Sequence, residues 1–83
     1  MNGKYLIEIT SRILRENEGN THEEITSAMD RALNDIGAKS RVDFQEQRTN
    51  DRCASSVEVR TCHYVDHGDG SRSETWCGPW GCQ

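Results

Sequence analysis

Apolar side chains are scarce in this chain of 83 residues, and they never form long runs. They make up 33% of the sequence, whereas an average globular chain has about 45–50%. A chain this short buries only about 60% of its unfolded surface. We therefore expect one small domain, residues 1–83, with a thin core. Because the longest apolar run has three residues, we expect neither a secretory segment nor a membrane span.

Positive charge is also in short supply. Ten Lys and Arg face fourteen Asp and Glu, which gives a net charge of −4, and neither half of the chain is basic. Proteins that neutralise nucleic-acid phosphates need a cationic face. We therefore expect neither a direct nucleic-acid partner nor a membrane partner. The expected location is cytoplasmic.

The clearest local pattern lies between residues 21 and 37. Thr21 and Glu24 have the spacing of a capping box, and Gly37 supplies a residue that ends helices. The apolar residues between them follow the helical period: Ile25, Ala28, Met29, Ala32, Leu33 and Ile36. This spacing predicts an amphipathic helix with one buried stripe.

Two later segments alternate with the period of a half-buried strand, residues 41–45 and residues 55–65. Asp69-Gly70 is favourable for a two-residue type I′ turn, which would fold the second strand back onto residues 71–77. Residues 4–14 fit either a strand or a helix, and their β-branched side chains favour the strand.

The predicted fold is α+β, with one amphipathic helix packed on a small, mainly antiparallel sheet in the order β-α-β-β-β. We expect weak order only in residues 49–55 and in a flexible C-terminal tail, residues 78–83.

Four cysteines are candidates for stapling so small a core: Cys53, Cys62, Cys77 and Cys82. The predicted turn places Cys62 directly opposite Cys77, within disulfide range. The other two cysteines would then form a second link or stay as thiols. The alternative is zinc, held by the four thiolates or by three with His63 or His67. The spacing argues against zinc, because zinc modules usually have two Cys-x₂₋₄-Cys knuckles. Here Cys77-x₄-Cys82 comes close to one, and Cys53-x₈-Cys62 does not. Cysteines in the cytosol are normally reduced, so unlinked thiols are a third option.

The run Trp76-Cys77-Gly78-Pro79 resembles the Trp-Cys-Gly-Pro-Cys redox motif of the thioredoxin family. That resemblance implies a second cysteine separated from the first by two residues, at the start of a helix that lowers the thiol pKa. Here Trp80 and Gly81 precede Cys82, which departs from the motif. Asp66-His67-Gly68-Asp69 has no nucleophile at a diagnostic spacing and is typical of a turn. We therefore predict no catalytic residues and no enzymatic activity.

Aromatic side chains concentrate near the C-terminus, beside an acidic turn. Rigid rings are enriched in binding hot spots, and charge next to them steers association. The predicted partner-binding residues are Tyr64, Asp66, Asp69, Trp76 and Trp80. Burial of the rings in a second small core is the competing interpretation.

The leading hypothesis is a small acidic protein-binding module without a cofactor. It would occlude a surface on a larger protein or complex, as phage and mobile-element inhibitors do to nucleic-acid-handling host or defence proteins. The alternative hypothesis is a small zinc-binding or thiol-redox-responsive domain that uses the four cysteines. A modified-peptide precursor is a third, which the strand pattern disfavours.

Overall fold

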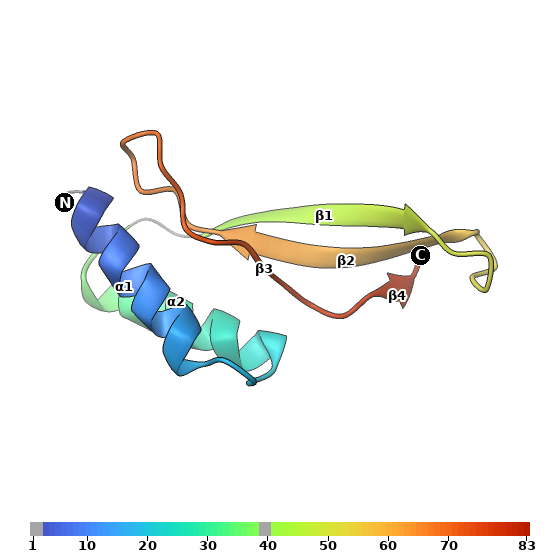
Figure 1. Cartoon of the computed structure of the whole chain (residues 1–83), viewed down its shortest axis with the longest axis horizontal. Coiled ribbons are helices and arrows are strands. Elements are labelled where there is room, and N and C mark those ends of the chain that lie inside the picture. The colour runs from blue at the N-terminus through green and yellow to red at the C-terminus, as the bar shows by residue number, and fades with distance from the viewer. Residues whose placement is uncertain (1–2, 39–40) are drawn as a thin grey trace.

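A computed structural model describes residues 3–38 and 41–83 and has an α+β fold (Figure 1). Two helices come first, and four antiparallel strands follow. The elements are α1 (Gly3–Glu16), α2 (His22–Asp35), β1 (Val42–Thr49), β2 (Val57–Tyr64), β3 (Trp76–Cys77) and β4 (Gly81–Cys82). The helices lie together at one end, and the long β1–β2 hairpin extends away from them (Figure 1). The molecule is therefore elongated, at 46 × 26 × 17 Å.

The N-terminal segment is a helix, so the predicted strand over residues 4–14 is wrong. The side chains of Leu6, Ile9 and Thr10 are buried at helical spacing, whereas Ile7 is 38% exposed. A strand would have placed Ile7 and Ile9 on the same buried face. The helical spacing of the apolar residues and their packing against α2 therefore outweigh the strand preference of the β-branched side chains. As a result, the element order begins with two helices.

The predicted helix between Thr21 and Gly37 is confirmed. Thr21 Oγ1 accepts a hydrogen bond from the Glu24 backbone N–H at 3.2 Å, and the Thr21 N–H donates to Glu24 Oε1 at 3.5 Å. Two of the donors that every helix N-terminus leaves unpaired are thus satisfied. At the other end Gly37 adopts a positive φ of 65°, which a residue without Cβ accepts readily.

The core lies between the helix pair and the near end of the sheet. Met29 and Leu33 of α2 are buried against Leu6 of α1, and Val65 and Trp76 complete the cluster. The indole N–H of Trp76 donates to Thr26 Oγ1 at 2.9 Å, so its polar atom is satisfied there. Neither α1 nor α2 covers the far half of the β1–β2 hairpin (Figure 1).

The turn after β2 is one residue longer than the sequence predicted. The His67 N–H bonds the Ser71 carbonyl at 3.1 Å, which closes a three-residue loop, Gly68–Gly70. The returning chain then carries one extra residue between Ser73 and Trp76. Such a bulge shifts the register by one position. The two deviations cancel, and Cys62 lies opposite Cys77 as predicted.

The C-terminal segment follows β2, although residues 78–83 were expected to form a weakly ordered tail. The Gly78 N–H bonds the Thr61 carbonyl at 2.8 Å, and the Gln83 N–H bonds the Val57 carbonyl at 3.0 Å. A disulfide joins Cys82 to Cys53 in the turn between β1 and β2, with a Cα–Cα distance of 5.4 Å. The same turn, also expected to be weakly ordered, is closed by a hydrogen bond from Asn50 N–H to the Ser56 carbonyl at 3.0 Å.

Leu33→Ala tests the packing of α2. Leu33 is 3% exposed, so truncation should lower the free energy of unfolding by about 2–5 kcal/mol. The neighbouring exposed Asn34→Ala is the control and should change it by less than about 0.5 kcal/mol. Urea denaturation measures both values, and equal small effects would contradict this core.

Candidate functional site

One face of the sheet gathers arginine and aromatic side chains, and we call it the arginine–aromatic face. Side chains alternate between the two faces of a strand, and the register of β1 with β2 places even-numbered residues opposite one another. The members are Phe44, Glu46, Arg48, Glu58, Arg60, Cys62, Tyr64, Arg72, Cys77 and Trp80. The opposite face packs on α2 through His63 and Trp76 near the helices. Farther out, that opposite face exposes Gln45 and Thr61.

Guanidinium groups lie on aromatic rings across this face. The Trp80 ring lies 4.1 Å from Arg48 Cζ and 4.6 Å from Arg60 Cζ. Arg72 Cζ is 4.8 Å from the Tyr64 ring centroid. Cation–π contacts of this kind hold the flexible side chains of arginine over the rings.

Carboxylates partly neutralise the arginines. Glu46 Oε1 accepts from Arg60 Nε at 2.6 Å, and the largely buried Glu58 pairs with Arg48. The Arg48 guanidinium, followed by the amide of Asn50, lowers the pKa of Glu58. Among the described residues, no carboxylate pairs with the exposed Arg72. Asp66 lies opposite Arg72 across the strands, but the two side chains form no ion pair, so the Arg72 guanidinium can donate to another molecule.

A groove of about 650 Å³ opens on this face between Phe44, Tyr64, Arg60 and Arg72. Phe44 and Tyr64 contact each other with ring centroids 5.9 Å apart. Ligand sites combine apolar walls with a few oriented polar groups, and this groove has both. The groove is open to solvent and not enclosed, which suits a protein surface better than a buried small molecule.

The predicted partner-binding residues do not form one surface. Tyr64 and Trp80 lie on the arginine–aromatic face, half-buried. Trp76, by contrast, is only 7% exposed and belongs to the core, so its assignment as an exposed anchor is corrected. Strict alternation would place Trp76 and Trp80, four residues apart, on the same side of the sheet. The register with β2 shifts by one residue between β3 and β4, and this shift places Trp80 on the other side, opposite Arg60.

The two acidic residues of the turn have structural partners. Asp66 accepts from the Gly68 N–H at 2.8 Å, and Asp69 accepts from the Ser71 N–H at 3.0 Å. The bonds from Ser71 lower the pKa of Asp69. Asp69 also lies against Gly3 at the start of α1, so close that a Cβ on Gly3 would collide with its carboxylate. Anions stabilise a helix N-terminus. Asp66 therefore stabilises the loop itself, and Asp69 also places the loop against the start of α1, which the sequence pattern had not indicated.

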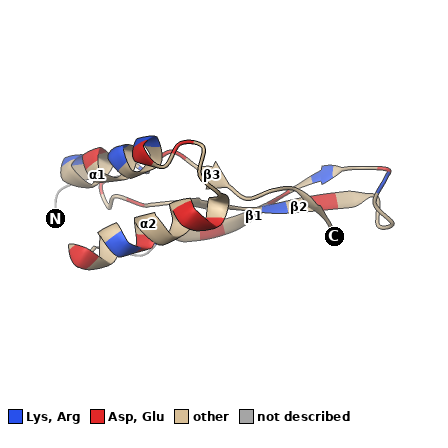
Figure 2. Cartoon of the chain, turned by 90° about the horizontal axis from the view of Figure 1, so that it is seen from below, with Lys and Arg blue, Asp and Glu red and all other residues tan. Residues whose placement is uncertain are grey.

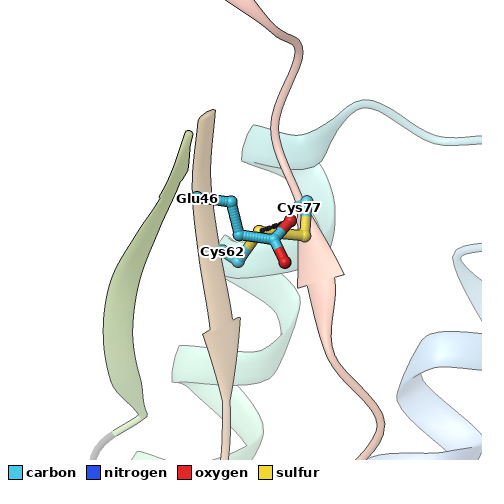
Figure 3. Close-up of side chains that lie close together, drawn as sticks. All are labelled: Glu46, Cys62 and Cys77. Carbon is cyan, nitrogen blue, oxygen red and sulfur yellow. Dashed lines mark hydrogen bonds between the residues drawn. A yellow bond between two sulfur atoms is a disulfide. The ribbon is translucent and has the colours of Figure 1, made fainter. Parts of the chain in front are cut away.

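Both pairs of cysteines form disulfides in the structure. Cys62 joins Cys77 across the strands with a Cα–Cα distance of 4.0 Å, and Glu46 Oε1 lies 3.5 Å from Cys62 Sγ (Figure 3). These three residues are the one group in the described chain whose potential ligand atoms gather within 4.8 Å. Both sulfurs are bonded to each other, and Arg60 occupies the carboxylate. The disulfide-bonded chain therefore offers no thiolate for zinc here.

The histidines considered as zinc ligands are buried and have other partners. His67 Nε2 lies 3.2 Å from Thr10 Oγ1, which joins the loop to α1. His63 lies between α2 and the sheet, where its Nε2 is 2.5 Å from His22 Nε2 and its Nδ1 is 2.8 Å from Asp43 Oδ1.

The two facing Nε2 atoms of His22 and His63 have room for one hydrogen between them. A carboxylate only accepts, so His63 Nδ1 carries a hydrogen that it donates to Asp43. The two Nε2 atoms face each other, so one donates and the other accepts. Burial, then the charge of His63, lowers the pKa of His22. Protonation of both rings would direct two N–H groups at each other and break the contact between α2 and β2.

Stability should therefore fall when the pH drops below 6.5, the ordinary pKa of histidine. A histidine whose pKa is lowered in the folded state binds its proton more readily after unfolding, so acid favours the unfolded chain. His22→Gln keeps a hydrogen-bonding group but does not titrate, and it should flatten this slope above the range where carboxylates titrate. Denaturant titrations at several pH values measure the slope. Equal slopes in the two proteins would contradict the one-proton contact.

Charge on the helices is mixed. α1 carries residues of both signs, whereas α2 is mainly acidic and has Arg31 as its one basic residue (Figure 2). None of the helices in the described residues is long and apolar enough to cross a membrane.

No family model matches the chain, and no curated protein or solved structure matches it either.

Proposed function

We propose that this chain is a non-enzymatic protein-binding module that docks through the arginine–aromatic face. The observation that carries the proposal is the set of three guanidiniums stacked on Trp80 and Tyr64 beside an open groove. Trp, Tyr and Arg are the residues most enriched in hot spots, because they deliver contact area and directed hydrogen bonds at low entropic cost. Stacked arginines are ordered before the partner arrives, which reduces the entropy lost on binding.

The face favours a partner surface with carboxylates among apolar side chains. Arg72 lacks a carboxylate partner among the described residues and can donate outward while its guanidinium lies on Tyr64. The acidic turn does not carry the docking in this proposal, because Asp66 and Asp69 accept hydrogen bonds from backbone N–H groups of their own loop. The protein would act by occluding a surface on a larger protein, as an inhibitor does, without turning over a substrate.

The zinc or redox alternative has less support. All four cysteines are in disulfides, and the carboxylate nearest to one pair is bound by Arg60. Disulfides persist mainly in oxidising surroundings. The cytoplasmic location expected from the sequence is therefore in conflict with these two disulfides, and a binding module outside the reducing cytosol agrees better with them.

Arg72→Ala tests the docking face with little risk to the fold, because Arg72 is exposed and its guanidinium lies on the surface of the Tyr64 ring. Partner captured by the immobilised chain should bind this variant at least about tenfold more weakly, which corresponds to a lost charged hydrogen bond of about 1.5–3 kcal/mol. Titration calorimetry with the captured partner measures the change.

Arg31→Ala is the matched control, because it removes the same charge from an exposed position on α2. It should leave binding unchanged. Thr61→Ala, on the exposed opposite face of β2, should also have no effect. If Arg31→Ala weakens binding as much as Arg72→Ala, the effect is general electrostatics and the docking face is wrong.

A further inference from the structure

β1 is an edge strand of eight residues with one free side. The sheet has the order β1-β2-β3, with β4 also paired to β2, and no other described strand pairs with β1. The hydrogen bond from Asn50 N–H to the Ser56 carbonyl fixes which residues bond toward β2. In an antiparallel ladder these alternate. The backbone groups that point outward are therefore those of Asp43, Gln45, Gln47 and Thr49.

This edge has few of the usual protections against pairing with another strand. Natural edges are blunted by proline, lysine, bulges or a covering element. The segment Val42–Thr49 contains no proline, glycine or lysine, and its pairing with β2 is unbroken over all eight positions. Asp43 is charged, but its carboxylate is bound by His63 and Arg41.

We propose that β1 pairs with β1 of a second copy of this chain, antiparallel and centred on Gln47. That register places Glu46 opposite the partner's Arg48, and it does so twice because the dimer is symmetric. A centre on Glu46 or Arg48 would oppose like charges, which destabilises a strand pair. Centres on Phe44 or Gln45 oppose no pair of unlike charges on this face. Charge complementarity on this face therefore favours a second copy as the occupant and Gln47 as the centre. The same register brings Asp43 opposite the partner's Asp51, which lies beyond the end of β1, and the Asp43 carboxylate is already bound by His63 and Arg41.

The dimer extends an existing ladder of charges. Within one chain Glu46 lies opposite Arg60, and Arg48 lies opposite Glu58. In the dimer each Glu46 lies between its own Arg60 and the partner's Arg48. The symmetry axis of antiparallel pairing is perpendicular to the sheet, so the arginine–aromatic faces of both copies become one continuous surface. This inference does not depend on the proposed function.

Two charge-reversed variants test the register. In Glu46→Arg alone, arginine opposes the partner's Arg48 twice, and in Arg48→Glu alone, glutamate opposes the partner's Glu46 twice. Each variant should weaken dimerisation at least about tenfold. Mixing the two restores unlike pairs at both positions, so the mixture should form a heterodimer. Each substitution also removes an ion pair inside its own chain, Glu46 with Arg60 or Arg48 with Glu58. Mixing does not restore these pairs, so a recovery on mixing reports contacts between chains only.

Gln47→Pro removes a backbone donor that points away from β2, which an edge strand tolerates. This variant should be monomeric with an unchanged far-ultraviolet circular dichroism spectrum. Sedimentation velocity over a wide range of concentration measures the dimer in every case. A wild-type chain that stays monomeric, a dimer that persists in Gln47→Pro, or single variants that mixing does not restore would each overturn the proposal.

Discussion

Two disulfides attach the C-terminal segment to β2, and the arrangement of the sheet depends on this attachment. β3 and β4 contain two residues each, so their backbone pairing alone provides only brief ladders. Cys62–Cys77 links the segment at one end of β2, and Cys53–Cys82 links it to the turn at the other end. Closing loops with sequence separations of 15 and 29 residues restricts the unfolded chain by about 3–4 kcal/mol each in the chain-entropy account. A chain with so small a core gains a large share of its stability in this way.

The two ends of the molecule are stabilised by different interactions. Near the helices, Met29, Leu33, Val65 and Trp76 form a core in the ordinary way. Far from the helices, neither α1 nor α2 lies over the sheet (Figure 1). There the strands are held together by cross-strand side-chain pairs and by the Cys53–Cys82 disulfide instead of a buried core. Both sheet faces are free there, which allows Trp80 to stack with arginines on a surface open to a partner.

Local patterns predicted the elements whose determinants lie close together in sequence. The capping box at Thr21 and the stripe that follows it specify α2, and the alternation of residues 55–65 specifies β2. The pairing of Cys62 with Cys77 was also predicted, although a longer loop and a bulge produce it. Residues 4–14 were misassigned, because their β-branched side chains suit a strand and their periodicity suits a helix. Contact with α2 decides between the two, and that contact is not visible in the local sequence.

Only part of the candidate site was predicted, because the choice of residues rested on nearness to the acidic turn and did not use the alternation of side chains along β2. Arg60 and Tyr64 share a face by spacing alone, and this signal was available in the sequence. The stacking of Trp80 on Arg48 could not be predicted, since it depends on how the C-terminal segment returns along β2. Trp76 and Trp80 look equivalent in the sequence, and only the register sends one to the core and the other to the surface.

Disulfide mapping of the unreduced chain tests the central claim most directly. Cleavage with trypsin and chymotrypsin separates the four cysteines, because Arg60, Tyr64, Arg72, Trp76 and Trp80 lie between or beside them. Mass spectrometry should then find the peptide with Cys53 linked to that with Cys82, and the peptide with Cys62 linked to that with Cys77. Links between Cys53 and Cys62 or between Cys77 and Cys82, or four free thiols in the folded protein, would contradict the account.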